Sequence, residues 1–150
     1  MLLIHDINEA VAIASTKRTR LILMSDRHVE ELPYPALNLN QQLSAELLET
    51  PQNVRAGLLT NLLPALLKKS AADPLILDGL EILFDRSLAV DPIRLLEACS
   101  RDKTILACWP GSINHAGLSY AIPSHPEYRI YKASDWRDVI YLDTDTQRLH

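Results

Sequence analysis

Three short runs of apolar residues constrain the fold of this chain more than any other feature of its sequence. The runs are Leu21–Met24, Leu75–Leu77 and Thr104–Cys108, and they show little alternation between apolar and polar residues. Such runs are typical of strands that are buried on both faces of a parallel sheet. A fourth segment, Ala36–Asn40, does alternate, which favours an edge strand with one face in water. The sequence therefore predicts a mostly parallel sheet.

Helical stretches separate these runs, and most of them begin with capping residues. Asp6 and Glu9 have the spacing of a capping box, in which the first side chain accepts from first-turn N–H groups. Thr50 and Asp91 each directly precede a proline, whose missing N–H costs nothing at the first helical position. One predicted helix begins at Asp6, and three more span about 41–49, 51–69 and 92–101. Pro64 is expected to kink the helix at 51–69.

The character of the chain changes after Cys108. Two alternating segments, Gly117–Ile122 and Tyr128–Lys132, are joined by five residues that include two prolines, which predicts a β-hairpin. Asp138–Asp143 offers a last strand. The sequence thus predicts one α/β domain over residues 1–143, a mostly parallel sheet with flanking helices and a C-terminal β-hairpin, followed by a polar tail at 144–150.

Composition narrows the class of protein further. The 150 residues fit one domain, and no apolar run approaches the roughly 20 residues of a membrane helix. The first residues lack the basic flank and apolar core of a signal peptide, so we expect a cytoplasmic protein. Cys99 and Cys108 are too few for a disulfide framework, and the five histidines show no zinc-binding spacing. The formal net charge of −4 argues against a dedicated nucleic-acid coat protein.

Candidate functional residues follow the predicted strands, because ligands in α/β sheets bind at the carboxyl ends of the strands. Pro74–Glu81 resembles the Walker B strand of a nucleotide-binding fold, in which an apolar strand ends in a carboxylate that holds magnesium through water. Asp78 and Glu81 are the two carboxylates of this segment. The ordinary alternative is that Asp78 caps the end of a strand and that Glu81 faces solvent.

Four segments of the chain resemble the BrxF family, small P-loop-type proteins of type 3 BREX bacteriophage-defence systems. They are Asn38–Asn40 (NLN), Leu75–Phe84 (LILDGLEILF), Asp91–Gly111 (DPIRLLEACSRDKTILACWPG) and Gly117–Arg129 (GLSYAIPSHPEYR). The resemblance spans roughly residues 20–131. It implies a P-loop NTPase-like core and a place in an antiviral, DNA-modifying defence complex.

The sequence departs from that family at the phosphate loop. A P-loop needs glycines whose N–H groups wrap a phosphate, a lysine for the terminal phosphates and a Ser or Thr for magnesium. The chain has no glycine before Gly57 and no Gly-Lys-Ser/Thr sequence. Only the ten residues Asp26–Pro35 separate the end of the first apolar strand from the strand predicted at Ala36–Asn40. A crossover connection that contains a helix takes about 10–12 residues even without a phosphate loop. Asp26, Glu30 and Glu31 would also repel a triphosphate. We therefore expect the phosphate loop and its helix to be absent.

A retained sheet without a phosphate loop favours a non-hydrolysing assembly subunit that docks other proteins of a BREX-like defence system, with no cofactor. The candidate partner surface comprises Asp26, Arg27 and His28 in the shortened loop, together with Trp109 and Gly111 after the last central strand. Trp109 itself is expected in the core or at an interface rather than as a base-stacking platform. A homo-oligomer is compatible with this hypothesis.

Two other hypotheses remain open. In the first, Asp78 and Glu81 bind magnesium beside an ATP whose phosphates are contacted by a neighbouring subunit. In the second, the basic residues Lys17, Arg18 and Arg20 contact the phosphates of DNA, together with Lys68 and Lys69. The ordinary explanation of the first three cations is a solvated helix end, where positive charge interacts favourably with the helix dipole.

Overall fold

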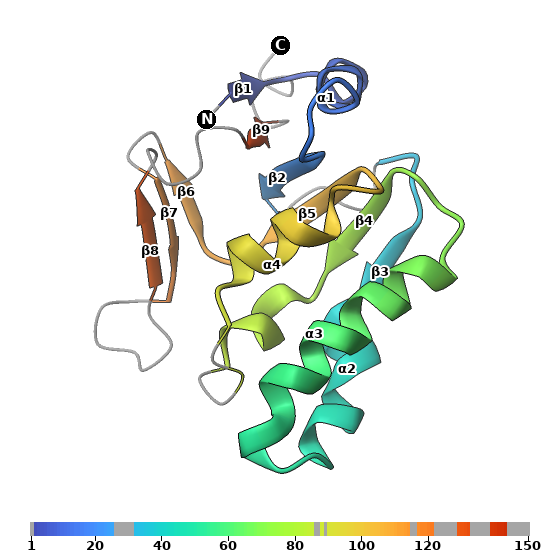
Figure 1. Cartoon of the computed structure of the whole chain (residues 1–150). Helices are drawn as coiled ribbons and strands as arrows, with labels where there is room; N and C mark the ends of the chain where they lie inside the picture. Colours follow the sequence, from blue (N-terminus) through green and yellow to red (C-terminus); the bar gives the residue numbers. More distant parts are fainter. Residues whose placement is uncertain are drawn as a thin grey trace.

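The computed structural model describes residues 2–25, 32–85, 88, 90–114, 117–121, 129–132 and 139–143 of the chain. Within them, a six-stranded sheet forms the centre of the fold (Figure 1). Every neighbouring pair of its strands is parallel. In spatial order the strands are β1 (Leu2–Ile4), β9 (Ile140–Leu142), β2 (Leu21–Ser25), β5 (Ile105–Trp109), β4 (Leu75–Asp78) and β3 (Ala36–Asn38).

A second, three-stranded antiparallel sheet follows β5 in the sequence. It contains β6 (Ser112–Asn114), β7 (Gly117–Tyr120) and β8 (Arg129–Lys132), in that order. The pairing of β7 with β8 confirms the predicted hairpin, whose proline-containing turn lies outside the described residues. The third strand, β6, pairs with β7 and was not predicted from the sequence.

Helices cover both faces of the large sheet. The helix α1 (Ile7–Ala14) packs against β1, β9 and β2 on one face. The other face carries α2 (Leu39–Leu48), α3 (Gln52–Lys69), α4 (Pro92–Cys99) and the 3₁₀ helix η2 (Leu80–Phe84). Figure 1 shows α1 apart from the other three α-helices. The arrangement confirms the predicted α/β class with a mostly parallel sheet and flanking helices.

Alternate side chains of each central strand enter two different cores. In β2, Leu21 and Leu23 belong to the core beneath α2, α3 and α4, whereas Ile22 and Met24 belong to the core beneath α1. All four side chains are at most 1% exposed. Burial on both faces explains why these strands are unbroken apolar runs in the sequence.

Asn38 ends a strand and begins a helix, which corrects one sequence prediction. The alternating segment Ala36–Asn40 was expected to be a strand throughout, but β3 stops at Asn38 and α2 starts at the next residue. The Asn38 side chain accepts a hydrogen bond from the N–H of Gln41 at 3.0 Å, so it is the N-cap of α2. The position of β3 at the edge of the sheet is as predicted.

The helix boundaries show which capping predictions were correct. Asp6 accepts from the N–H of Asn8, and Asp91 accepts from the N–H groups of Ile93 and Arg94, as expected for N-caps. Thr50 does not cap α3, because its hydroxyl donates to the carbonyl of Glu46 and the N-cap is Pro51 without a side-chain bond.

Within the described residues, no helix is long and apolar enough to span a bilayer.

Candidate functional site

The carboxyl ends of the central strands bring the predicted Walker B-like segment next to the end of β3. Asn38 of β3 is the register partner of Asp78 of β4, and β5 ends nearby at Trp109. This is the edge at which open α/β sheets bind ligands.

Asp78 is half-buried, and its side chain hydrogen-bonds to the backbone of the turn that follows it. Its Oδ1 accepts a hydrogen bond from the N–H of Gly79 at 2.8 Å. Gly79 has φ +65°, a left-handed conformation that suits glycine, and it directs the chain from β4 into η2. One carboxylate oxygen of Asp78 is thus engaged in capping the end of the strand.

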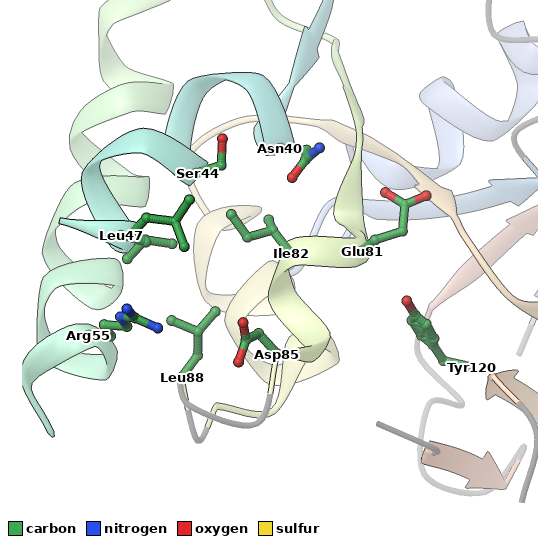
Figure 2. A pocket seen from close by; sticks show the side chains of 10 residues that line it. Asn40, Ser44, Leu47, Arg55, Glu81, Ile82, Asp85, Leu88 and Tyr120 are labelled. Carbon is green, nitrogen blue, oxygen red and sulfur yellow. The ribbon is translucent and has the colours of Figure 1, made fainter. Parts of the chain in front are cut away.

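Glu81 is exposed on the first turn of η2 and lies on a pocket of about 340 Å³, which we call the η2 pocket. Figure 2 shows Glu81 near Tyr120 at one side of this pocket, with Arg55 at the other. Asp78 does not line it. The structure therefore separates the chemical surroundings of the two carboxylates, although they are three residues apart in the sequence.

The η2 pocket combines apolar walls with charged groups from separate elements. Arg55 comes from α3, Asp85 follows η2, and Tyr120 comes from β7. The apolar part includes Leu47 and Leu48 of α2 and Ile82 of η2. Arg55 is partly fixed, because its Nε donates to the carbonyl of Thr50 at 2.8 Å. An apolar floor with a few polar groups is the usual composition of a binding site for an organic ligand or a peptide side chain.

Metal ligands do not gather around Asp78 in the described part of the chain. No group of three or more His, Cys, Asp or Glu side chains there has the arrangement of a metal site. Asp78 and Glu81 are the pair of carboxylates that the sequence predicted for magnesium. Within the described residues, they are not part of a larger group of possible metal ligands.

Trp109 is part of the core, where it connects the two sheets. The indole is 1% exposed, and its Nε1–H donates to the carbonyl of Ser119 at 3.0 Å. Its ring also makes edge contacts with Phe84 at 5.3 Å and Tyr131 at 5.9 Å between centroids. This burial removes Trp109 from the partner surface suggested by the sequence and matches the expectation of a core position.

Gly111 is exposed at the same edge of the fold. A Cβ built on it would overlap the carbonyl of Ser119, so the glycine permits close approach of β6 and β7. Asp26, Arg27 and His28, the other members of the predicted partner surface, lie outside the described residues. Within the described chain, this surface is therefore represented by Gly111.

The return segment, residues 32–35 directly before β3, lies on the face of the sheet that α1 covers. Leu32 and Tyr34 pack against the core beneath α1, and the carbonyl of Pro35 accepts from the N–H of Ile76 at 3.0 Å. Residues 32–35 form no helix. Side chains of the return segment thus cover part of a sheet face that α1 does not cover alone.

The predicted basic cluster lies at the opposite end of the strands. Lys17, Arg18 and Arg20 connect the end of α1 to the start of β2. Because the sheet is parallel, its amino and carboxyl ends form different edges, so these cations and Asp78 do not belong to one site. Arg18 is exposed, and the other two are half-buried.

Sequence reasoning missed most of the η2 pocket. Arg55, Asp85 and Tyr120 are distant in the sequence and carry no motif. Leu48 directly follows Leu47 in the sequence, and Leu43 and Leu47 have the spacing of a buried helix face. The sequence did not show that Leu48 itself is 74% exposed.

Comparison with known proteins adds no family to these observations, since no family model, curated protein or solved structure matches the chain.

Proposed function

We propose that this chain is a non-hydrolysing assembly subunit of a BREX-like antiviral defence system. In this proposal its fold is a P-loop NTPase-like core without a phosphate loop, and its role is to dock partner proteins. The defence setting rests on the resemblance to the BrxF family described above. The proposed loss of nucleotide binding rests on the short segment of chain after β2.

The order of the parallel strands supports a P-loop-like ancestry. The strand that would precede a phosphate loop, β2, and the strand with the Walker B-like Asp78, β4, are separated by one strand, β5. P-loop enzymes of the kind that the resemblance implies often end the intervening strand in a polar sensor. Here that strand ends in the buried Trp109.

The observation that carries the proposal is the length of chain left after β2. This strand ends at Ser25, and Leu32 already packs on the sheet face, so only the six residues 26–31 lie between them. None of the six is a glycine. A P-loop takes about eight residues and two glycines before its helix continues. The segment is therefore too short to enclose a polyphosphate.

The helix N-termini that follow β3 and η2 are also engaged. Asn38 caps α2, and Asp91 caps α4, so first-turn N–H groups that bind phosphate in nucleotide-binding folds are bonded to side chains of the chain itself. Asp91 would in addition repel an anion. These two helix N-termini are therefore occupied by side chains of the chain itself and offer fewer free N–H groups to an anion.

The η2 pocket offers a docking surface at the carboxyl-end side of the sheet, formed by α2, α3, η2 and β7. Leu48, on its border, is 74% exposed, the highest value among the large apolar side chains of the described residues. Two carboxylates, Glu81 and Asp85, accompany one cation, Arg55, in the lining. We assign this pocket to a partner segment that places an apolar side chain against Leu48 and a lysine or arginine near Glu81.

Size-exclusion chromatography of this chain with the proteins encoded beside it tests the docking role. We expect co-elution with at least one of them, and loss of that complex in the Leu48→Ser variant. Ile130→Ser is the matched control, because Ile130 is also largely exposed, at 62%, but lies on β8. Co-elution with none of these proteins would contradict the docking role. Equal effects of the two variants would contradict the assignment to the η2 pocket.

A further inference from the structure

The amino-end edge of the parallel sheet gathers three chain connections that are far apart in the sequence. They are residues 15–20 before β2, residues 68–74 before β4 and residues 100–104 before β5, which we call the basic edge. The N–H of Arg20 donates to the carbonyl of Ser100 at 2.9 Å, and the N–H of Leu75 donates to that of Thr104 at 3.0 Å. In Figure 1 the three connections lie together at the upper right of the sheet.

The charge of this edge is opposite to that of the whole chain. It holds seven of the 15 lysines and arginines and only two of the 19 acidic residues, in a chain of formal net charge −4. The cations are Lys17, Arg18, Arg20, Lys68, Lys69, Arg101 and Lys103. One of the two carboxylates, Asp73, is used internally, because its Oδ1 accepts from the N–H of Thr104.

Most of these cations have no acidic partner within the part of the chain that the structure describes. Lys103 is engaged, since its Nζ donates to the carbonyls of Leu67 and Ser70 at 2.9 and 2.7 Å and closes the end of α3. Among the described residues, the side chains of the other six make no ion pair. The Nε of Arg20 is buried and has no hydrogen-bond acceptor there. Within the described residues, the basic edge therefore carries more positive than negative charge.

From this excess of positive charge we propose that the basic edge binds the phosphodiester backbone of a nucleic acid. The strands β2, β5 and β4 are adjacent, so the connections that precede them lie side by side in one line at this edge of the sheet. Lysine and arginine side chains in such a line neutralise successive phosphates and release counterions. The proposal is independent of the assembly role, because the η2 pocket involves none of these residues.

The residues of the basic edge favour a nucleic acid over a membrane surface. A peripheral membrane site combines cations with apolar side chains that enter the headgroup region. The large apolar side chains that are exposed in the described chain, Leu3, Leu48, Val54 and Ile130, all lie elsewhere. The edge also has no aromatic residue to stack on a base. Binding is therefore expected to depend on charge and not on nucleotide sequence.

Fluorescence anisotropy with a fluorescein-labelled duplex DNA of arbitrary sequence tests the proposal. If about four phosphates are neutralised, affinity falls about 100-fold between roughly 50 and 200 mM salt. Arg18→Gln and Arg101→Gln each remove one exposed cation of the edge and are expected to weaken binding about tenfold at the lower salt. Arg94→Gln is the matched control, because Arg94 is an exposed arginine at the other end of α4.

Three results would overturn the proposal: no DNA binding at the lower salt, a DNA affinity that does not change with salt concentration, or an equal loss of affinity in all three variants. Vesicles that contain phosphatidylserine replace DNA in a parallel titration, and binding to vesicles alone would assign the edge to a membrane and reject the nucleic acid. The thermal unfolding midpoint of each variant confirms that the fold is intact, since the three arginines are exposed.

Discussion

The backbone of Gly79 lies directly against the side chain of Asn38, at the point where β4 and β3 end side by side. A Cβ built on Gly79 would overlap the Asn38 amide oxygen, which is the atom that caps α2. Gly79 also has φ +65° and donates its N–H to Asp78. The Walker B-like carboxylate, the turn after it and the start of α2 are therefore one packed unit, and changes in one of them affect the others.

Replacement of Gly79 by alanine is expected to lower the free energy of unfolding by about 1–3 kcal/mol, because it adds a left-handed non-glycine residue and displaces the Asn38 cap. Gly57→Ala is the control. Gly57 lies in α3, and an alanine Cβ at this position would point into open space, so this change is expected to stabilise the protein by about 0.5–1 kcal/mol. Urea denaturation measures both. Equal effects of the two substitutions would contradict the packed unit.

Asp91 joins α4 to the second sheet, and its removal is expected to cost more than the loss of a simple cap. Its Oδ1 accepts from the N–H of Ile93 at 3.1 Å and from the hydroxyl of Tyr131 at 2.9 Å. Asp91→Ala should lower the free energy of unfolding by about 2–3 kcal/mol, from the cap and from the buried hydroxyl. Asp6→Ala, which removes only the cap of α1, should cost about 1 kcal/mol.

A double-mutant cycle with Tyr131→Phe isolates the contact between Asp91 and the second sheet. We expect a coupling free energy of about 1 kcal/mol between the two residues. Additive effects of Asp91→Ala and Tyr131→Phe would show that the hydroxyl bond does not stabilise the fold.

Burial raises the pKa of the Cys99 thiol from 9.0 to about 11. The folded state therefore holds this proton to higher pH than the unfolded state, and the free energy of unfolding is expected to fall as the pH rises from 9 to 11. At a pH below 9, the folded thiolate fraction should be about 100-fold lower than in the unfolded chain. Alkylation rates of native and guanidinium-unfolded protein check this expectation.

Cys99→Ser provides the control for that measurement, because it leaves only Cys108, which is buried in the sheet. Native Cys99 that reacts as fast as the unfolded thiol would contradict the burial of this side chain.

The parts of the fold that local chemistry determines could be predicted from the sequence. Asp91 before Pro92 fixed the start of α4, and the apolar run Leu21–Met24 identified a strand buried on two faces. Leu39 and Asn40 were placed in a strand because the segment alternates, but Asn38, the last residue of β3, also acts as an N-cap and starts α2 at the next residue. Local pattern alone did not distinguish these two uses of the residue.

Long-range relationships could not be predicted in the same way. The three residues of β1 are too few for a periodic pattern, and β9 pairs with β1 and β2 from the far end of the chain. The η2 pocket and the basic edge are both assembled from separate segments, so their composition becomes visible only when the strand order is known. The sequence did identify Asp78, Glu81 and five of the seven basic-edge cations as candidates, and it placed the carboxylates and the cations at two separate sites.

The central claim is that the end of β2 no longer holds a polyphosphate, and calorimetric titration of ATP with magnesium into the purified chain tests it most directly. The short, glycine-free segment 26–31 predicts no saturable heat of binding. Saturable micromolar binding that is lost in the Asp78→Asn variant would contradict the account and establish a nucleotide site at this edge of the sheet.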